Sequence, residues 1–338
     1  MANGPSLRDI ADKTGLSVSG VSRALREDAS IPQKTRDRVL KAAASLGYSP
    51  NPQVSMLMAE IHRRSPVKYR GTLAWVRMTS RWPEEPYTAR CRKGAEERAR
   101  TLGYTLDTFS VDDLSRTRLN VVLKARGIQG VLVAPLPHSR YHLVLDWNAF
   151  AGVAIGNSLR RPLLSRVVNH QYHSVQVALR EMRRRGYQRL ALCLNRENSA
   201  RTDHNWLAGA LVHRHLLGAE VSVMLMRQWD KARNGILSWL RRTRIQAVLS
   251  PHAPFLEFLR QGGLNIPNEM GFACLDLSPE NTSAGIDQRH DQVGQIAADM
   301  LIGQILRRES AVHTRPVATL VEGSWKDGDT LPRRRMER

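Results

Sequence analysis

The N-terminal fold is decided by residues 6–25, which read SLRDIADKTGLSVSGVSRAL. In this stretch Ser6 and Asp9 are spaced as a capping box, in which a hydroxyl and a carboxylate satisfy the free amides at a helix start. A helix is therefore expected over residues 7–13. Gly15 can adopt the positive φ that often ends a helix, so a tight turn is expected to follow.

Two further helices are expected after this turn. Ser17 is placed to cap the second helix, which extends through Leu25, and a third helix is expected to end at Gly47. Apolar residues recur at helical spacing in all three. Those able to face one another are Ile10, Ala11, Leu16, Val21 and Leu25 in the first two helices, and Val39, Leu40, Ala43 and Leu46 in the third. Three short helices of this kind can share one small core.

Residues 50–64 form a separate segment. Pro50 and Pro52 prevent the third helix from continuing, but Asn51 is a good cap and Pro52 suits a first helical position. A short helix is expected over residues 53–61. A helix of this length is rarely stable alone in water, so we expect it to become ordered only against a partner. An amphipathic linker helix that packs on the next domain is the alternative.

The C-terminal two-thirds of the chain alternate apolar runs with amphipathic stretches. This alternation is typical of parallel sheets with helices on both faces. A first series of alternating strands and helices begins near Thr72, and a second series begins near Val167. The expected strands are residues 72–76, around 106, 128–133, 190–194, 221–225, 247–249 and 272–275, with helices such as 94–102, 121–125 and 206–217 between them. The sequence therefore predicts an α/β domain of two doubly wound lobes.

Length and composition restrict the class of protein. A chain of 338 residues is long enough for two or three domains, and a formal net charge of +20 favours polyanionic partners. The sequence shows neither a leader pattern nor an apolar stretch as long as a membrane span, so a cytoplasmic protein is expected. Cys91, Cys193 and Cys274 lie far apart and are interpreted as reduced core thiols, not as a disulfide framework or zinc site.

The sequence does not predict an enzyme. It contains no Walker loop, no G-x-G-x-x-G after a strand, no H-E-x-x-H and no G-x-S-x-G. His138 and His142 stand four apart, a spacing that can bind a metal on one helix face, but no third ligand is near them in sequence. Neither a cofactor nor a metal is therefore expected. A secreted solute-binding protein is a further alternative, against which the helix-turn-helix argues.

Five motifs of the N-terminal region occur in a recognisable order: LRDIA at 7–11, GLSVS at 15–19, VSRAL at 21–25, TRDRV at 35–39 and LGYSPNP at 46–52. They resemble the headpiece of the lactose-repressor (LacI/GalR) family of bacterial transcriptional regulators. The resemblance implies that the second helix enters the major groove, where Val18, Ser19 and Arg23 read bases. Arg can donate to guanine, Ser can pair with several base edges, and Val can touch a thymine methyl. The residues implied in phosphate contacts are Ser6, Ser17, Ser22 and Thr35.

The same resemblance identifies residues 50–64 as a hinge. It implies that Leu57, paired with the same residue of a second chain, wedges into the minor groove and kinks the duplex. Asn51 and Val54 are expected to contact the minor groove beside it. Two-fold symmetry then predicts a homodimer that binds a pseudo-palindromic operator.

Motifs at 94–96, 167–170, 186–190 and 266–269 and an expected helix over 292–301 resemble, more weakly, the periplasmic-binding-protein-like effector domain of that family. In that fold a small molecule sits between the lobes at the carboxyl ends of the strands. Aromatic faces can stack on a sugar ring, and Asp and Arg can bond to vicinal hydroxyls. The predicted effector-binding residues are Asp276, Trp229, Trp206, Arg201, Tyr87 and His138. Further loop candidates are Trp82, Pro135, Asn157, Arg196 and His252.

These interpretations divide the chain into a helix-turn-helix headpiece (1–49), a hinge and linker (50–64), an effector-binding and dimerisation domain (65–330) and a basic tail (331–338). The N-lobe is expected at about 69–166 and 288–315, and the C-lobe at about 167–287 and 316–330. The predicted function is a transcriptional repressor controlled by a sugar or sugar derivative, and the net charge makes an anionic effector a candidate. Trp206 and Asn169 depart from the family's pocket residues, so an effector-independent DNA-binding regulator is the alternative.

Overall fold

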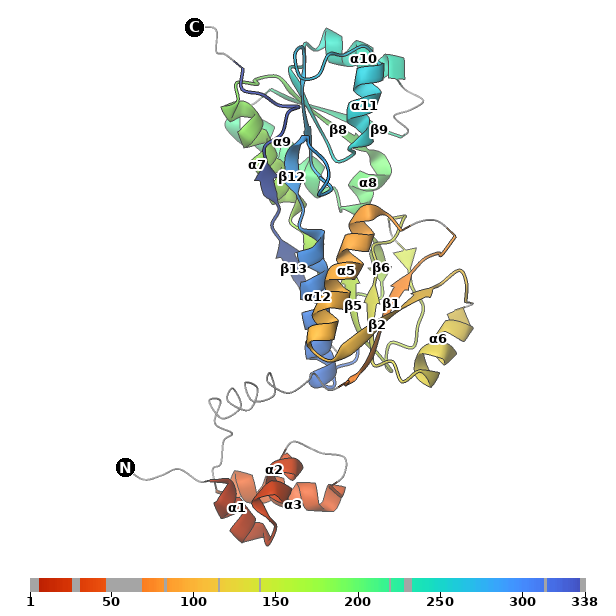
Figure 1. Cartoon of the computed structure of the whole chain (residues 1–338), viewed down its shortest axis with the longest axis vertical. Coiled ribbons are helices and arrows are strands. Elements are labelled where there is room, and N and C mark those ends of the chain that lie inside the picture. The colour runs from red at the N-terminus through yellow and green to blue at the C-terminus, as the bar shows by residue number, and fades with distance from the viewer. Residues whose placement is uncertain are drawn as a thin grey trace, which may run out of the picture. The chain divides into compact units, whose positions relative to one another are not determined.

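The structure is a computed structural model that describes residues 6–25, 31–46, 69–81, 84–114, 116–139, 141–218, 220–227, 233–312 and 315–334. The chain divides into two compact units, Met1–Lys68 and Tyr69–Arg338, which Figure 1 colours from red to blue along the chain. The predicted hinge lies outside the described residues. Within the described ranges, no helix combines the length and the apolar character of a membrane span.

Three helices are described in the first unit: α1 (Leu7–Thr14), α2 (Val18–Leu25) and α3 (Gln33–Ser45). The predicted capping box is present, because the amide of Asp9 donates to Ser6 Oγ at 3.4 Å and the amide of Ser6 donates to Asp9 Oδ2 at 2.7 Å. Gly15 ends α1 with a φ of 65°. Ser17 Oγ accepts from the amide of Gly20 at 3.1 Å and so caps α2. The predicted helix-turn-helix is confirmed.

The core of the first unit holds Ile10, Ala11, Val21, Ala24, Val39, Ala42 and Ala43. One expected core position is wrong, because Leu40 is 43% exposed. A helix advances by about 100° per residue, so Val39 and Ala43 share a face that Leu40 does not. The apolar spacing of α3 therefore runs through residues 39, 42, 43 and 46, without residue 40.

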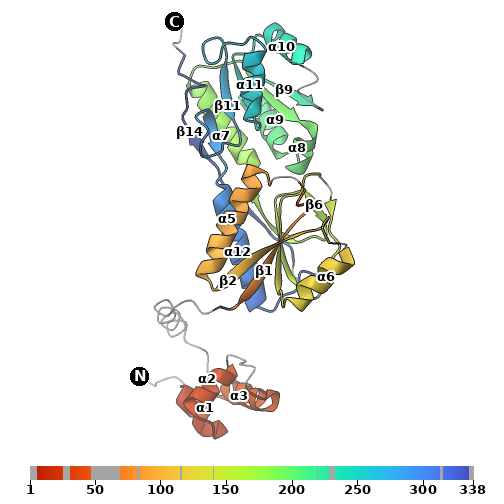
Figure 2. The same ribbon diagram turned by 45° about the vertical axis from the view of Figure 1, so that its right-hand side comes forward.

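The N-lobe of the second unit is built on a parallel sheet of six strands in the order β13-β7-β5-β3-β1-β2. These are β1 (Gly71–Arg77), β2 (Tyr104–Ser110), β3 (Gly130–Val133), β5 (Ala151–Ile155), β7 (Ser165–Asn169) and β13 (Ala318–Val321). Leu73 and Trp75 pack towards α5 (Pro86–Thr101) and α12 (His290–Leu306), which lie side by side in Figures 1 and 2. Ala74 and Val76 alternate with them and face α6 (Arg116–Ala125). A short pair, β4 (Tyr141–His142) and β6 (Leu159–Arg161), adds to this lobe.

The C-lobe repeats this plan with strand order β14-β12-β11-β10-β8-β9. Its strands are β8 (Leu190–Asn195), β9 (Val221–Met226), β10 (Ala247–Ser250), β11 (Gly271–Cys274), β12 (Ala284–Asp287) and β14 (Ser324–Lys326), the last antiparallel to β12. Leu192 faces the helices α7 (Gln171–Arg184) and α9 (Asn205–Leu217), whereas Cys193 faces α10 (Arg233–Arg242) and α11 (Pro254–Gln261). A short helix, α8 (Arg196–Arg201), follows β8. Both lobes therefore have helices on both faces of a sheet, as predicted.

Three chain segments connect the lobes, between β7 and α7, between β12 and α12, and between β13 and β14. They correct two expected lobe boundaries. Residues 167–169 belong to β7, which pairs with β5, and residues 318–321 form β13, which pairs with β7, so both lie in the N-lobe sheet and not in the C-lobe. A buried apolar strand can complete either sheet, and only its pairing decides which one.

The three cysteines are free and buried, as expected for core thiols. Burial raises the pKa of Cys193 and of Cys274 to about 12, so both thiols stay protonated near neutral pH. His138 and His142 do not share a helix. His142 ends β4, and His138 lies in the loop before it, so helical spacing does not apply to this pair.

Candidate functional site

Helix α2 contains the predicted base-reading positions. Val18, Ser19 and Arg23 are its first, second and sixth residues. Val21 and Ala24 bury one side of α2 in the three-helix core, and the helical advance places positions 19 and 23 on the opposite side. Val18 is 43% exposed, so its side chain is accessible to a partner such as a thymine methyl.

The predicted phosphate contacts that the structure describes lie at helix starts. Ser6 and Ser17 cap α1 and α2, and Thr35 lies in the first turn of α3, where its amide donates to the carbonyl of Pro32. Helix starts and hydroxyl groups are both common phosphate ligands. The side chains of Ser19, Ser22 and Arg23 lie outside the described part of the structure, as do the hinge residues Asn51, Val54 and Leu57.

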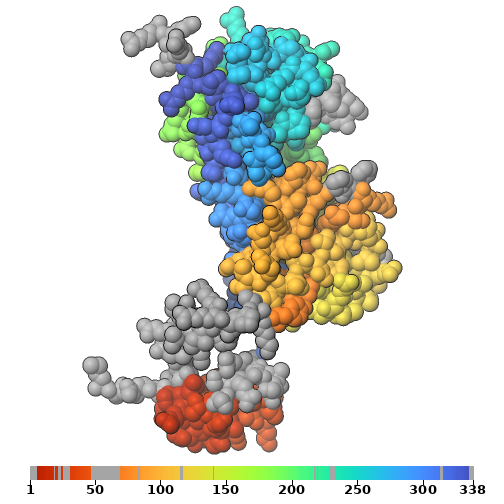
Figure 3. Space-filling view, in the orientation of Figure 1, coloured from red at the N-terminus to blue at the C-terminus, as the bar shows by residue number. Residues whose placement is uncertain are grey.

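A cavity of about 820 Å³ lies between the two lobes of the second unit. Its walls include segments that follow strands of both sheets, such as Pro135 after β3, Gly156 after β5, His252 after β10 and Asp276 after β11. Parallel strands direct their carboxyl ends to one edge of a sheet, so loops from the two sheets meet around this cleft. Figure 3 shows the first turns of α5 meeting the C-lobe.

An ion pair joins the lobes inside the cleft. Asp276 Oδ1 lies 2.7 Å from Nε2 of His290, and Nδ1 of His290 lies 4.0 Å from Sγ of Cys91. Burial alone would lower the pKa of His290, but the charge and hydrogen bond of Asp276 outweigh it and raise this pKa to about 10. His290 is therefore a cation near neutral pH.

Arg201 and Tyr87 contact each other across the cleft. Arg201 Nη2 donates to Tyr87 Oη, and the guanidinium carbon lies 5.7 Å from the centroid of the Tyr87 ring. Tyr87 also packs beside His290, with ring centroids 5.6 Å apart. Two predicted effector residues, one from each lobe, are thus in direct contact.

A second histidine of the cleft is in a different state from His290. The Nδ2 of Asn198 lies 2.8 Å from Nε2 of His252. Burial lowers the pKa of His252, although the Asp276 carboxylate opposes the shift. His252 is therefore neutral near pH 7, and its Nε2 can accept the hydrogen bond from the Asn198 amide. The cleft combines one charged and one neutral imidazole.

Two buried donors stand beside the cavity. Trp206 packs in the C-lobe core with 7% of its surface exposed and also reaches the cavity wall. Its Nε1, like Nε of Arg201, is buried and has no hydrogen-bond partner among the described residues. A buried donor without an acceptor costs free energy. A ligand rich in oxygen atoms would supply acceptors at this wall.

The structure brings together most of the predicted effector residues that it describes. Asp276, Trp206, Arg201 and Tyr87 line the cavity, together with the loop candidates Pro135, Asn157 and His252. His138 does not line the cavity: it is exposed in the loop after β3. Arg196 is also absent from the cavity wall. Trp229 and Trp82 lie outside the described residues.

Several cavity residues were missed by the sequence analysis, including His290, Gln288 and Arg90. Gln288 connects the lobes, because its Nε2 donates to Leu275 O at 2.6 Å and its carbonyl accepts from Asn169 Nδ2 at 2.7 Å. Gln288 and His290 follow β12, a strand that the sequence analysis did not predict. Recognising that strand would have marked them as residues at a carboxyl strand end.

Residues 6–51 match the family described as bacterial regulatory proteins, lacI family. The HTH-type transcriptional regulator GalS of Salmonella typhimurium is 39% identical over 56 residues, which cover 17% of this chain and 16% of GalS. GalR of Lacticaseibacillus casei is 29% identical over 131 residues, which cover 38% of this chain and 34% of GalR. The matches therefore span about a sixth and a third of these relatives. Both relatives are described as transcriptional regulators and not as enzymes.

Solved structures extend the likeness over nearly the whole chain. A structure described as the transcriptional regulator CelR-cellobiose complex has a TM-score of 0.57 at 20% identity, covering 96% of this chain and 99% of that chain. The lac repressor dimer bound to operator and the anti-inducer ONPF has a TM-score of 0.57 at 16% identity, covering 98% of this chain and 100% of that chain. These likenesses show the fold: a helix-turn-helix followed by a two-lobed α/β domain of the periplasmic-binding-protein type.

Proposed function

We propose that this chain is a sequence-specific DNA-binding repressor that acts as a homodimer on a pseudo-palindromic operator. The match of residues 6–51 to the lacI family of bacterial regulatory proteins supports this proposal. A sugar or sugar derivative binds between the lobes and controls the affinity for DNA. The observation that carries the proposal is the capped helix-turn-helix of α1 and α2 within the matched residues.

In this proposal α2 supplies the base contacts. Arg23 can donate two hydrogen bonds to guanine, and Ser19 and Val18 contact the neighbouring base edges. Two headpieces related by two-fold symmetry then read two inverted half-sites. The hinge supports this mode through Leu57, which inserts into the minor groove with its partner's copy, beside Asn51 and Val54. A protein of similar fold, the lac repressor, is described as a dimer bound to operator.

The cleft has the chemistry of a polyol site. A volume of about 820 Å³ lies within the range of small-molecule pockets. Asp276 gives one oxygen to His290, and its other oxygen can accept from a ligand hydroxyl. Trp206 Nε1 and Arg201 Nε are donors without partners among the described residues, and Tyr87 offers an aromatic ring to a sugar face. A regulator of similar fold, CelR, is described in complex with cellobiose.

The charges of the cleft also suit an acidic sugar derivative. His290 is cationic, and Arg201 reaches the same cavity. A carboxylate or phosphate of the ligand could pair with these groups, whereas Arg90 is already paired with Asp287 and Asp291 at 3.4 and 3.0 Å. Sugar acids and sugar phosphates therefore belong in the same screen as neutral sugars.

The DNA proposal is tested by selecting bound sequences from a random duplex library with the full-length chain. We expect the selection to enrich an inverted repeat. A footprint on this sequence should show the same protection on both halves of the repeat. A bound pool without an inverted repeat would contradict the proposal. Affinity for the selected DNA no higher than for a scrambled duplex at the same salt concentration would contradict it as well.

The effector proposal is tested by thermal-shift screening against neutral sugars, sugar acids and sugar phosphates. A ligand that binds only the folded chain raises its unfolding temperature. We expect one of these classes of compound to raise the unfolding temperature of the wild type but not that of Asp276→Asn.

An effector-independent regulator is the second candidate, favoured by the direct contact of Arg201 with Tyr87 across the cleft. It predicts no shift with any compound and operator binding that no compound changes.

A further inference from the structure

The segments that connect the lobes lie against one another. The amide of His170 donates to Val321 O at 2.8 Å, which joins the start of α7 to the end of β13. Asn169 Nδ2 donates to the carbonyl of Gln288 at 2.7 Å, and Ser174 Oγ donates to Gln288 Oε1 at 3.2 Å. All three crossovers are therefore linked, and side chains from separate parts of the sequence meet there.

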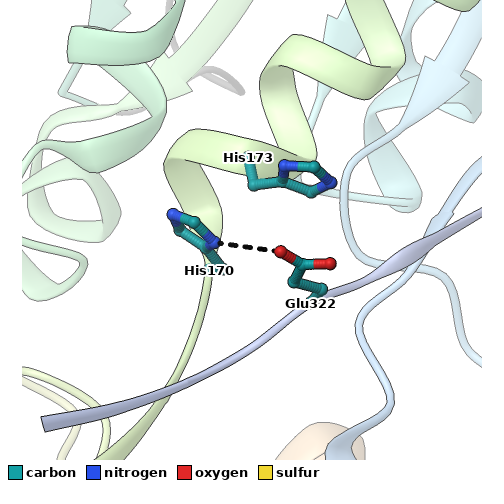
Figure 4. Close-up of side chains that lie close together, drawn as sticks. All are labelled: His170, His173 and Glu322. Carbon is teal, nitrogen blue, oxygen red and sulfur yellow. Dashed lines mark ion pairs between the residues drawn. The ribbon is translucent and has the colours of Figure 1, made fainter.

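Two histidines and a glutamate lie close together where these crossovers meet. His170 immediately precedes α7, His173 lies in its first turn, and Glu322 follows β13. One potential metal-binding atom from each of the three lies within 4.8 Å of those from the other two. Figure 4 shows both rings and the carboxylate gathered in one space, and His170 Nδ1 lies 3.9 Å from Glu322 Oε1. The two rings stack with centroids 5.4 Å apart.

We propose that His170, His173 and Glu322 bind a divalent transition-metal ion of the zinc type. Two imidazole nitrogens and one carboxylate oxygen are a ligand set that Zn²⁺ accepts, with a fourth position left for water. Mg²⁺ and Ca²⁺ prefer oxygen ligands throughout, so they fit this set poorly. The side chain of Glu322 is 63% exposed and that of His170 28%, so small rotations can bring the ligand atoms to coordination distance.

The surroundings of the site leave room for a cation at this position. The start of α7 carries partial positive charge, which by itself disfavours a cation, and the Glu322 carboxylate offsets it. Cys91, Cys193 and Cys274 are buried, so they do not compete for an added metal ion in the folded chain. None of the three proposed ligands lines the inter-lobe cavity, so the site is separate from the effector site.

A bound ion would connect α7 of the C-lobe to the segment that follows β13 of the N-lobe. These two segments are more than a hundred residues apart in the sequence and meet only in the folded chain. An ion that binds only this arrangement stabilises the fold and raises the unfolding temperature, by an amount that grows with the logarithm of the ratio of its concentration to its Kd.

The test is a titration of the untagged full-length chain with Co²⁺, followed by its visible absorption, and with Zn²⁺, followed by calorimetry. We expect one ion per chain. His170→Ala and His173→Ala should each weaken binding by at least about tenfold, and Glu322→Gln, which keeps the side-chain shape, should weaken it too. His215→Ala is the matched control, because His215 is exposed on α9 away from the cluster in sequence and should leave binding unchanged.

Circular dichroism of each variant separates loss of the ligand from loss of the fold. A folded wild-type chain that binds neither ion, or a folded double variant H170A/H173A that binds Zn²⁺ as tightly as the wild type, overturns the proposal. The experiment requires neither DNA nor a sugar, so its outcome is independent of the proposed regulatory function.

Discussion

Asp276 Oδ1 lies 2.7 Å from Nε2 of His290, and this pair joins the two lobes of the second unit. Asp276 follows β11 of the C-lobe, and His290 is the first residue of α12, which packs in the N-lobe. The pair therefore positions the carboxylate that we assign to the effector and at the same time holds one lobe against the other.

The stability of the second unit is predicted to depend on pH through His290. Its pKa is raised from 6.5 to about 10 in the folded chain, so the folded state retains a proton that the unfolded state releases. The stabilisation is complete below pH 6.5 and is lost as the pH rises towards 10. Within this window the free energy of unfolding should fall by up to about 1.4 kcal/mol per pH unit from this group.

Urea unfolding at several pH values inside that window measures the effect. His290→Gln should show a flatter dependence on pH than the wild type, whereas His215→Gln, at an exposed position, should match the wild type. If the free energy of unfolding changes with pH equally in the wild type and in His290→Gln, then Asp276 does not hold His290 in its charged form.

Specific DNA binding is predicted to require Arg23. Replacing it by Ala removes the hydrogen bonds to guanine, so affinity for the selected operator should fall by about 1–3 kcal/mol while weak, salt-sensitive binding to any duplex remains. Fluorescence anisotropy with operator and scrambled duplexes gives both affinities. Lys41→Ala, at an exposed position of α3, is the control for general loss of positive charge. Undiminished operator selectivity in Arg23→Ala would remove this residue from the base-reading set.

The contact between α5 and α12 is predicted to tolerate no side chain at Gly294. A Cβ there would lie 1.8 Å from the carbonyl oxygen of Cys91, which the backbone cannot accommodate without shifting. Gly294→Ala should therefore destabilise the chain by about 1–3 kcal/mol or more. Gly235→Ala is the matched control, since a Cβ at that helical position meets no atom within 4 Å and should be neutral or slightly stabilising. Equal unfolding temperatures for the two variants would contradict the close packing.

Asp276→Asn is predicted to abolish the response to the effector and to leave operator binding intact. A hydrogen bond to a charged group contributes about 1.5–3 kcal/mol, so affinity for the ligand found by thermal shift should fall by one to two powers of ten. Operator binding with and without that ligand measures both properties. Asp299→Asn, which alters an exposed pair with Arg98, should behave as the wild type. A normal response in Asp276→Asn would move the effector contacts elsewhere in the cleft.

The features predicted correctly from the sequence depend on neighbours in the chain. Ser6 and Asp9 are three residues apart, and Gly15 and Ser17 act on the helix ends beside them. The strand alternation that separates Leu73 from Ala74 is likewise a local property. Asp276 lies at the cavity wall because it follows an apolar run that the sequence marks as a strand.

The features that were missed depend on which segments meet. β7 and β13 are apolar strands that either lobe could have accepted, and hydrogen bonding assigns both to the N-lobe sheet. His138, chosen as a loop residue after a strand, lies away from the cavity, because the position of a loop residue depends on the path of the whole loop. His290 follows β12, a strand that the sequence analysis did not predict, and its positive charge depends on Asp276, which follows a different strand.

The sequence by itself determined the helix-turn-helix, its caps and the α/β class of the second unit, because capping and apolar spacing act over a few residues. The tertiary structure alone decided the partner of Asp276, the contact of Arg201 with Tyr87 and the meeting of His170 with Glu322. Each of these pairs joins segments separated by long stretches of chain, and only the packing of the two sheets and their crossovers brings them together.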